Sequence, residues 1–162
     1  MSGRPVVDIN LFFHNEAQHL EDVIRSILDQ TWDAWRLTLI DDGSSDESRE
    51  IAERWAGRDR RIGLKRFRAN QGIVSGFRAA FLLGDADFVM PKSGDDLIAP
   101  TFIEEIMRVL EDPRVAMCHA GAVVIDSNGN VTAEVPASTR LATPTVHGQG
   151  QRPRRKPVTG CS

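Results

Sequence analysis

The sequence is poor in cysteine and contains no long apolar run. Its two cysteines are Cys118, in an apolar stretch, and Cys161, next to the last residue, and neither has a second cysteine at the spacing of a zinc site. The sequence therefore predicts neither a disulfide framework nor a structural zinc ion. No apolar run approaches the roughly 18 residues of a membrane-spanning helix. The first residues also lack the apolar core of a secretory signal peptide, so a cytoplasmic location is expected.

Three motifs of nucleotide-binding and hydrolytic proteins are also absent. No G-x-G-x-x-G follows the first predicted strand, and no G-x-x-x-x-G-K-[ST] occurs anywhere in the chain. Neither a Rossmann dinucleotide site nor a P-loop is therefore expected, because both need these turns to hold phosphate. The absence of G-x-S-x-G disfavours an α/β-hydrolase. No repeat with a period of about 20 to 50 residues is visible.

Acidic residues are missing from the last part of the chain. The sequence has 20 Lys and Arg against 23 Asp and Glu, a formal net charge of −3, yet no acid follows Glu134. Residues 1–134 hold all 23 acids and 15 bases, a net charge of −8, whereas residues 135–162 hold five bases and no acid. We expect a folded domain over residues 1–135 and a basic, Pro- and Gly-rich, disordered tail over residues 136–162. Nucleic-acid binding is not expected of a tail without aromatic residues.

Strand and helix patterns alternate along the rest of the sequence. Apolar residues at i, i+3, i+4, i+7 and i+8 predict a helix over Leu20–Leu28, after a β-branched and aromatic strand over Val6–Phe13. The capping-box spacing Ser44-x-x-Glu47 predicts the start of a second helix. The other predicted elements are strands over Trp35–Ile40, Ile62–Phe67, Phe88–Met90, Val115–Ile125 and Val131–Val135, and helices over Ile73–Leu83 and Phe102–Leu110. This alternation predicts a three-layer α/β fold, a mostly parallel sheet flanked by helices.

Polar side chains follow each of the first four predicted strands. They are Asn15 and Glu16, then Asp41 and Asp42, then Asn70 to Gly72, then Asp95 and Asp96. Because ligands of open α/β sheets bind beyond the carboxyl ends of the strands, we expect these groups to surround one crevice. Two acidic pairs in one crevice require a counter-charge, and carboxylate oxygens suit Mg²⁺ or Mn²⁺. The alternative is that these residues only form turns and helix caps, for which Asp, Asn, Gly and Ser are the usual residues.

Four of these segments follow one another in a specific order. They are Phe13-His14-Asn15-Glu16, Leu39-Ile40-Asp41-Asp42-Gly43-Ser44-Ser45-Asp46, Asn70-Gln71-Gly72 and Asp95-Asp96. In this order they resemble the opening of a family 2 glycosyltransferase with the GT-A fold, whose N-x-G turn and D-x-D-D metal motif correspond to the last two segments. The resemblance covers roughly residues 6–130.

The resemblance implies transfer of a sugar from a nucleotide donor, commonly a UDP-sugar, with Mg²⁺ or Mn²⁺ holding the diphosphate. It places base and ribose beside Phe13, Asn15 and Glu16, a hydrogen bond from the base on Asp42, the N-x-G turn at Gly72, a phosphate contact at Arg78, and the metal on Asp95 or Asp96. The chain departs from the family pattern at Phe12, where a proline is usual, and at Ser93, where the first Asp of D-x-D is expected.

No catalytic residue is assigned from the sequence. An inverting transferase needs a carboxylate base, which in this family lies beyond the region of resemblance, and Glu134 is the sole acid after Asp126. One alternative is therefore a non-catalytic nucleotide-binding domain that needs a partner. A receiver-type signalling domain is disfavoured, because its acidic pair should follow the first strand, where this chain has Asn15 and Glu16. The acceptor stays open as a glycan, a lipid or a protein, with peripheral membrane contact as a further expectation.

Overall fold

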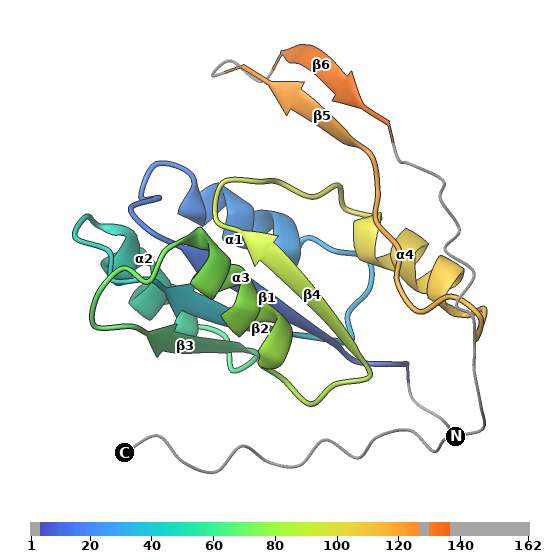
Figure 1. Cartoon of the computed structure of the whole chain (residues 1–162), viewed down its shortest axis with the longest axis horizontal. Coiled ribbons are helices and arrows are strands. Elements are labelled where there is room, and N and C mark those ends of the chain that lie inside the picture. Colours follow the sequence, from blue (N-terminus) through green and yellow to red (C-terminus); the bar gives the residue numbers. More distant parts are fainter. Residues whose placement is uncertain (1–3, 127–129, 137–162) are drawn as a thin grey trace. The chain divides into compact units, whose positions relative to one another are not determined.

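The computed structural model describes residues 4–126 and 130–136, and the chain divides into two compact units, Met1–Val109 and Leu110–Ser162 (Figure 1). The strands of the first unit are β1 (Val7–Phe13), β2 (Trp35–Asp41), β3 (Ile62–Arg66) and β4 (Phe88–Ser93). Its helices are α1 (Leu20–Leu28), α2 (Ser48–Ala56), α3 (Ile73–Leu82) and α4 (Phe102–Leu110), which ends at the boundary of the units. In the second unit, β5 (Ala122–Ile125) and β6 (Val131–Val135) form an antiparallel hairpin.

The four strands of the first unit form one parallel sheet in the order β3-β2-β1-β4. The chain therefore builds the sheet outward from β1 to β3 and then returns to the other side of β1 for β4. Phe13 pairs with Asp41, and Phe12 pairs with Ser93, so the carboxyl ends of β1, β2 and β4 lie at one edge. Between β1 and β4 the strand order reverses, which is where open α/β sheets form their ligand crevice.

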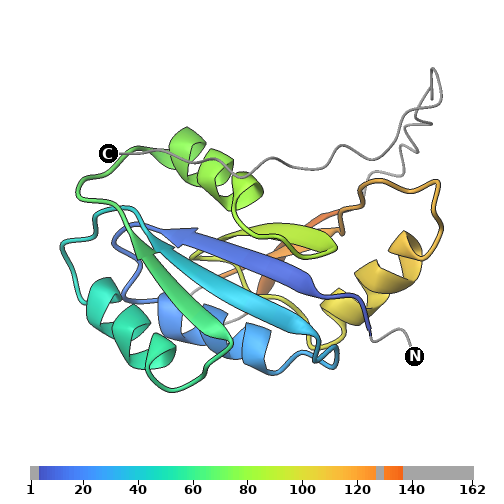
Figure 2. The same cartoon turned by 90° about the horizontal axis from the view of Figure 1, so that it is seen from below.

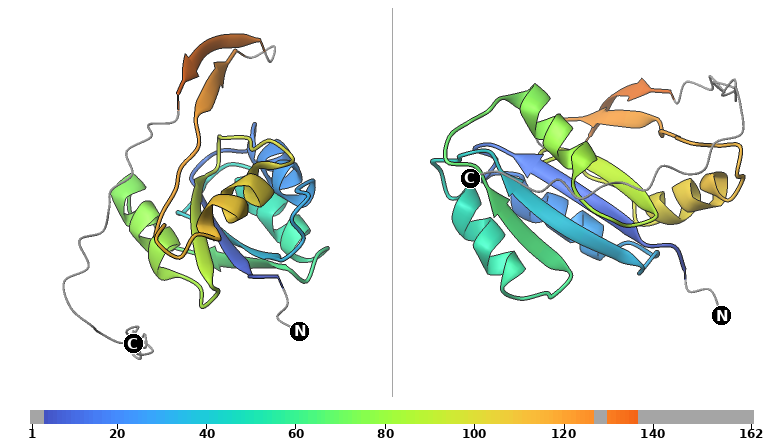
Figure 3. Two further views of the ribbon diagram at one scale, coloured as in Figure 1. Left: turned by 90° about the vertical axis from the view of Figure 1, so that its right-hand side faces the viewer. Right: turned by 60° about the horizontal axis from the view of Figure 1, so that its bottom comes forward.

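The helices of the first unit cover both faces of the sheet. Helices α1 and α2 lie on one face, and α3 lies on the other (Figures 2 and 3). Right-handed crossovers require this arrangement, since the connection from β3 to β4 runs in the opposite direction to the two before it. The predicted three-layer α/β fold with a parallel sheet is confirmed. In the described part of the chain, no helix has the length and apolar character of a membrane span.

Alternate residues of β1 explain how the two faces are filled. Val7, Ile9 and Leu11 are buried on the side of α1, where the predicted apolar face of that helix is also buried. On the other side, Phe12 packs with Ile40 of β2 and Ala80 of α3. Asn10 is fully buried beneath α3, and its Nδ2 donates to the carbonyl oxygens at the end of that helix, Ala80 O at 2.8 Å and Leu83 O at 2.9 Å.

Two predicted strands differ from the structure, and one predicted segment is not tested by it. The strand predicted over Phe88–Met90 continues through Pro91 to Ser93; within the described sheet β4 is an edge strand, where the missing N–H of proline is tolerated. The strand predicted over Val115–Ile125 is wrong for its first half, since only Ala122–Ile125 is extended and paired. The predicted tail, residues 136–162, lies outside the described residues apart from its first residue, so its boundary stays a prediction.

The capping box predicted at Ser44 is also wrong. Helix α2 begins at Ser48, its N-cap is Glu47, and no side chain caps it. Ser44 is instead buried, and its hydroxyl accepts a hydrogen bond from the loop that follows β1. Its backbone N–H donates to Asp41 Oδ1 at 2.8 Å. A residue that the spacing places in a helix cap thus joins two loops.

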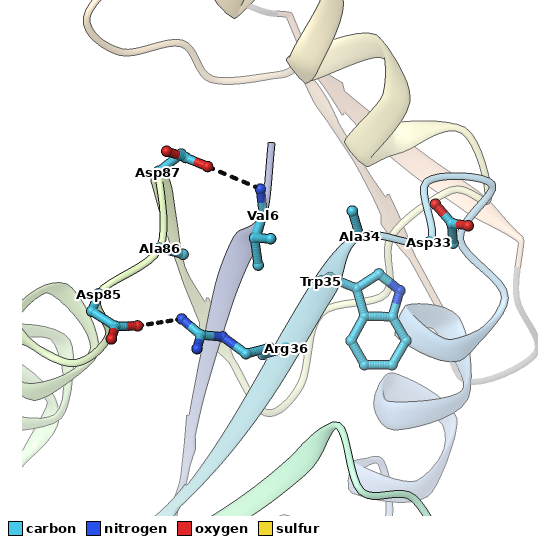
Figure 4. Close-up of a pocket in the computed structure, with 8 residues that line it drawn as sticks. All are labelled: Val6, Asp33, Ala34, Trp35, Arg36, Asp85, Ala86 and Asp87. Carbon is cyan, nitrogen blue, oxygen red and sulfur yellow. Dashed lines mark hydrogen bonds and ion pairs between the residues drawn. The ribbon is translucent and has the colours of Figure 1, made fainter. Parts of the chain in front are cut away.

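An ion-pair network closes the opposite, amino-terminal edge of the sheet. Asp8 is 4% exposed and accepts hydrogen bonds from Arg36 Nε at 2.7 Å and from the backbone N–H groups of Asp85 at 2.9 Å and Ala86 at 3.0 Å. Arg36 also pairs with the exposed Asp85 (Figure 4), and the hydrogen bonds to Asp8 and Asp85 raise the pKa of Arg36. The neighbouring open cavity, about 430 Å³ in volume, lies at this amino edge, away from the predicted site.

Asp8→Asn should lower the free energy of unfolding by about 2 to 3 kcal/mol, because an amide N–H₂ would face donors that the buried carboxylate now satisfies. Asp85→Asn is the matched control: Arg36 contacts both carboxylates, but Asp85 is exposed, so its loss should cost far less than the loss of Asp8. Urea unfolding followed by circular dichroism measures both. Equal losses for the two variants would contradict this account of the network.

Candidate functional site

The loops after β1 and β2 are joined at the carboxyl edge by hydrogen bonds from consecutive backbone N–H groups. The donors are the backbone N–H groups of Asn15, Glu16 and Ala17, and the acceptors are Ser44 Oγ at 3.1 Å, Ser48 Oγ at 2.8 Å and Asp46 Oδ2 at 3.1 Å, in that order. Polar side chains of the second loop therefore fix the backbone of the first. These backbone bonds leave the Asn15 and Glu16 side chains available for other contacts.

Asn15 adopts a backbone conformation that few residues tolerate. Its φ is +56°, in the left-handed region where asparagine is among the favoured non-glycine residues. Its side-chain Oδ1 returns a hydrogen bond to the second loop, accepting from Ser45 N at 2.8 Å. Asn15 therefore stabilises the turn, whether or not it also contacts a ligand. This is the structural alternative that the sequence left open.

Asp42 connects the end of β2 to the turn that begins α3. Asp42 is 4% exposed, and its carboxylate accepts from the backbone N–H of Gln71 at 2.9 Å and of Gly72 at 3.1 Å, one on each oxygen. Its own backbone N–H donates to Phe13 O at 2.9 Å, at the end of β1. Asp42 therefore brings three of the four predicted segments to one place, and each carboxylate oxygen keeps a lone pair for another donor.

The fourth segment meets the first at the point of strand reversal. Gly94 lies so close to the end of β1 that a Cβ on it would come within 2.6 Å of Phe13 Cβ and 3.4 Å of Glu16 Cγ. Only glycine allows this approach without displacing the two loops. Burial raises the pKa of Glu16, and the nearby Asp95 carboxylate raises it further. The loops after β1 and β4 are thus close enough for their carboxylates to affect each other.

The acidic turn after β4 has a buried lysine beneath it. Asp95 and Asp96 are exposed, whereas Lys92 is 6% exposed in β4, and its Nζ donates to the backbone carbonyl of Asp96. Ser93, the last residue of β4, donates from its Oγ to Asp95 Oδ1 in the turn. Burial lowers the pKa of Lys92, and the charges of Asp96 and Asp95 oppose that effect. Lys92 holds the turn in place through the main chain and leaves both acidic side chains on the surface.

The residues of this turn fit the divalent cation that the resemblance implies. Asp95 and Asp96 supply exposed, hard oxygen ligands beside the strand reversal. Among the described residues, no group of three or more His, Cys, Asp or Glu is placed to hold a metal ion. A cation here would therefore take its remaining ligands from water and from phosphate oxygens, as Mg²⁺ commonly does.

Two predicted site residues stand apart from the others. Phe13 is only 2% exposed, so little of its ring is left for a ligand to contact. Arg78 is exposed on α3, two residues from both Gly76 and Ala80, the residues that bury against the sheet, so it lies on the opposite side of the helix. The remaining predicted residues, Asn15, Glu16, Asp42, Gly72, Asp95 and Asp96, share the carboxyl edge. Their roles toward a ligand stay predictions.

Sequence reasoning missed Ser48 and Lys92. Ser48 was hidden because a serine near a helix start is usually a cap, and only the fold shows that its hydroxyl contacts another loop. Lys92 did leave a signal, a charged residue between an apolar strand and an acidic pair. Ending the predicted strand before Pro91 placed that lysine in a turn rather than in the sheet.

Gly43→Ala should disturb the carboxyl edge more than Gly72→Ala, although both glycines have positive φ, +73° and +85°. A Cβ at Gly43 would lie 2.7 Å from the backbone carbon of Ala69, whereas nothing lies within 4 Å of one at Gly72. Gly72 also has a ψ of 161°, a backbone region essentially confined to glycine, so Gly72→Ala should lower the unfolding free energy by about 1 to 3 kcal/mol through strain alone, whereas Gly43→Ala should lower it by about 3 kcal/mol or more because the Ala69 backbone must also move. Chemical denaturation of both variants checks this, and a loss at Gly43 below about 1 kcal/mol would refute the close packing.

Asp95→Asn should lower the pKa of Glu16 toward its ordinary range without restoring it, because burial is the larger cause of the shift. Since the raised pKa favours the neutral carboxyl in the folded chain, Glu16 costs stability as the pH rises from the ordinary carboxyl range through its raised pKa. A ¹³C NMR titration of the Glu16 carboxyl measures the shift. Asp96→Asn is the control and should leave Glu16 unchanged; an effect of equal size there would contradict the geometry.

Curated relatives of this chain are glycosyltransferases. It is 29% identical over 156 residues to the putative glycosyltransferase EpsE of Bacillus subtilis, covering 91% of this chain and 56% of EpsE. It is 28% identical over 137 residues to an uncharacterized glycosyltransferase of Haemophilus influenzae, covering 85% of this chain and 55% of that protein. The chain thus spans little more than half the length of these two relatives.

Solved structures with a similar fold include two described as complexes with sugar nucleotides. The mannosyltransferase PcManGT from Pyrobaculum calidifontis, in complex with GDP-Man and Mn²⁺, superposes with a TM-score of 0.64 at 21% identity, covering 77% of this chain and 37% of that one. TarS of S. aureus in complex with UDP-GlcNAc gives a TM-score of 0.58 at 15% identity, covering 65% and 31%. At these identities the similarity establishes the fold. The family model of glycosyl transferase family 2 matches residues 9–161, and the chain therefore belongs to glycosyltransferase family 2.

Proposed function

We propose that this chain binds a nucleoside-diphosphate sugar, in particular a UDP-sugar, at the carboxyl edge of its sheet, and that it takes part in transferring the sugar to an acceptor. The observation that carries the proposal is the convergence of the four polar segments at the strand reversal. Asp42 holds the turn at Gly72, and Gly94 packs against Phe13 and Glu16. Such an edge is where α/β sheets bind nucleotides.

Each part of the edge has a proposed task. Asn15 and Glu16, on a loop fixed by three backbone hydrogen bonds, would border the base and ribose. Asp42 would accept from the base with a lone pair not used by the α3 turn. Asp95 and Asp96 would hold Mg²⁺ or Mn²⁺, which supplies Lewis-acid stabilisation of the departing diphosphate. Lys92 would keep their turn in position through the Asp96 carbonyl.

The relatives support the donor class more than the acceptor. Structures of similar fold are described with GDP-Man and Mn²⁺, with UDP and with UDP-GlcNAc. The acceptor, a glycan, lipid or protein, and a cytoplasmic location with peripheral membrane contact belong to the same proposal. Membership of the glycosyltransferase family removes the reason for a receiver-type signalling domain.

Calorimetric titration of UDP into the purified chain, with Mn²⁺ and with EDTA, tests donor binding. We expect affinity at least tenfold higher with Mn²⁺, since the cation bridges the turn and the phosphates. Asp95→Ala plus Asp96→Ala should remove this gain, whereas Glu105→Ala plus Glu111→Ala, which removes two exposed acids elsewhere, should keep it. A gain that survives in the Asp95 and Asp96 variant would reject the metal site, and no UDP binding under either condition would reject the donor site.

Release or transfer of the sugar from a UDP-sugar, measured on the same preparation, distinguishes a transferase from a non-catalytic nucleotide-binding domain. Turnover that depends on Asp95 and Asp96 supports the transferase. UDP binding without turnover supports the alternative, a nucleotide-binding domain that needs a partner.

A further inference from the structure

Helix α3 has its small residues inside and its large apolar residues outside. Gly76 and Ala80 are the buried positions of the helix. Five large apolar side chains are exposed instead: Ile73 at 67%, Val74 at 78%, Phe77 at 39%, Phe81 at 53% and Leu82 at 66%. Scattered exposed apolar residues are ordinary in soluble proteins, but five on one helix of ten residues indicate an interaction surface.

The packing of α3 on the sheet explains why these side chains point outward. A Cβ at Gly76 would lie 2.8 Å from Phe12 Cδ2, so the helix backbone lies directly on the Phe12 ring. Phe77 leans on the same ring, with centroids 4.6 Å apart, and remains partly exposed. A helix this close to the sheet has no room beneath it for Ile73, Val74 or Phe81. Among the described residues, their exposure follows from how closely the helix packs on the sheet.

The segment that contains α3 is positively charged, although the rest of residues 1–134 is acidic. Residues 60–83 contain six basic residues and no acid, although residues 1–134 as a whole carry a net charge of −8. Arg61 pairs with Asp59, and Arg66 pairs with Glu53. Lys65, Arg68 and Arg78, by contrast, are exposed and form no ion pair with another described residue.

These three cations border the apolar patch. Arg78 lies on the exposed side of α3 itself, and Arg68 lies in the loop that leads from β3 to α3. Lys65 of β3 pairs with Ile40 of β2, which packs with Phe12 and Ala80, so Lys65 faces the α3 side of the sheet. We call Lys65, Arg68, Arg78 and the five exposed apolar residues of α3 the α3 surface.

We infer that the α3 surface docks on an anionic lipid bilayer. Apolar side chains on one side of a helix enter the boundary between head groups and acyl chains, and neighbouring Lys and Arg contact the lipid phosphates. The stems of Lys65 and Arg68 are long enough to reach head groups while the helix lies in the interface. The segment 135–162, which contains five bases and no acid, would be attracted to the same membrane.

Other occupants agree less well with these residues. A single-stranded nucleic acid could stack on the exposed Phe81, but it would leave the aliphatic Ile73, Val74 and Leu82 in water. A second copy related by a two-fold axis would bring the same surface of both chains together, with three cations from each chain and no acid among the residues of that surface. A bilayer with acidic lipids satisfies the apolar and the charged residues together.

Co-sedimentation of the full chain with vesicles tests the inference, and it needs no nucleotide, so its result is independent of the proposed donor site. We expect binding to phosphatidylcholine vesicles that contain about 30% phosphatidylserine to exceed binding to pure phosphatidylcholine at least tenfold, and to weaken with added salt. Val74→Ser plus Phe81→Ser should reduce the partition coefficient about tenfold. Lys65→Ser plus Arg68→Ser should reduce it by a similar factor on the anionic vesicles alone.

The matched control is Val109→Ser plus Met117→Ser, which removes two apolar side chains that are 50% and 80% exposed outside the α3 surface. It should bind vesicles as the unchanged chain does, and circular dichroism should show the same fold for all variants. The basic tail is intact in every variant, so its charge cannot produce a difference between them. Equal binding by the Val74 and Phe81 variant, or a vesicle-free dimer that the same variant abolishes, would overturn the inference.

Discussion

The buried carboxylate of Asp42 is the contact on which the carboxyl edge depends. A side chain from the end of β2 accepts two consecutive backbone N–H groups of the turn that begins α3, while its own N–H is bonded to the end of β1. Charge-assisted hydrogen bonds of this kind are stronger than neutral ones and poorly replaced by water once buried. One residue therefore joins the ends of β1 and β2 to the start of a helix. The loop after β1 is held separately, by Ser44, Ser48 and Asp46.

The strand order brings the groups that Asp42 joins to the edge of the sheet where a ligand crevice forms. Because the chain returns past β1 to form β4, α3 crosses to the opposite face of the sheet, and its first turn arrives at the same edge as the loops after β1 and β2. Gly94 then allows the loop after β4 to touch the loop after β1. The strand order places the loops at one edge, and three residues hold the loops together there. They are the buried carboxylate of Asp42, Asn15 with its positive φ, and Gly94, which has no room for a Cβ.

Much of this arrangement could be predicted from residue patterns, and the exceptions have physical causes. The buried face of α1 follows from the spacing of Leu20, Val23, Ile24 and Ile27, and the parallel sheet follows from the alternation of elements. The convergence of polar segments follows from the rule for strand ends. Local spacing could not show that the Ser44 hydroxyl serves a different loop, because that loop is 29 residues away in sequence. Nor could it show that Pro91 continues a strand, which depends on β4 lying at a sheet edge.

Arg78 is a second residue whose position could not be predicted from the sequence. The resemblance assigns it a phosphate contact from its position in a motif, but its place on α3 depends on which residues the helix buries. Gly76 and Ala80 decide that orientation through their small size, which only the packing against Phe12 reveals. The motif position therefore predicts a phosphate contact for Arg78, whereas the packing of α3 places Arg78 on the exposed side of the helix.

The inverted packing of α3 has a consequence for local unfolding. A helix that buries only glycine and alanine removes little apolar area from water, so its release from the sheet costs less than the release of α1, which buries Leu20, Val23, Ile24 and Ile27. Backbone amides of α3 should accordingly exchange with solvent sooner than those of α1. Since the first turn of α3 is held by Asp42, the helix that opens most readily is anchored at its N-terminal end by the carboxyl edge itself, and any ligand bound there would slow that opening.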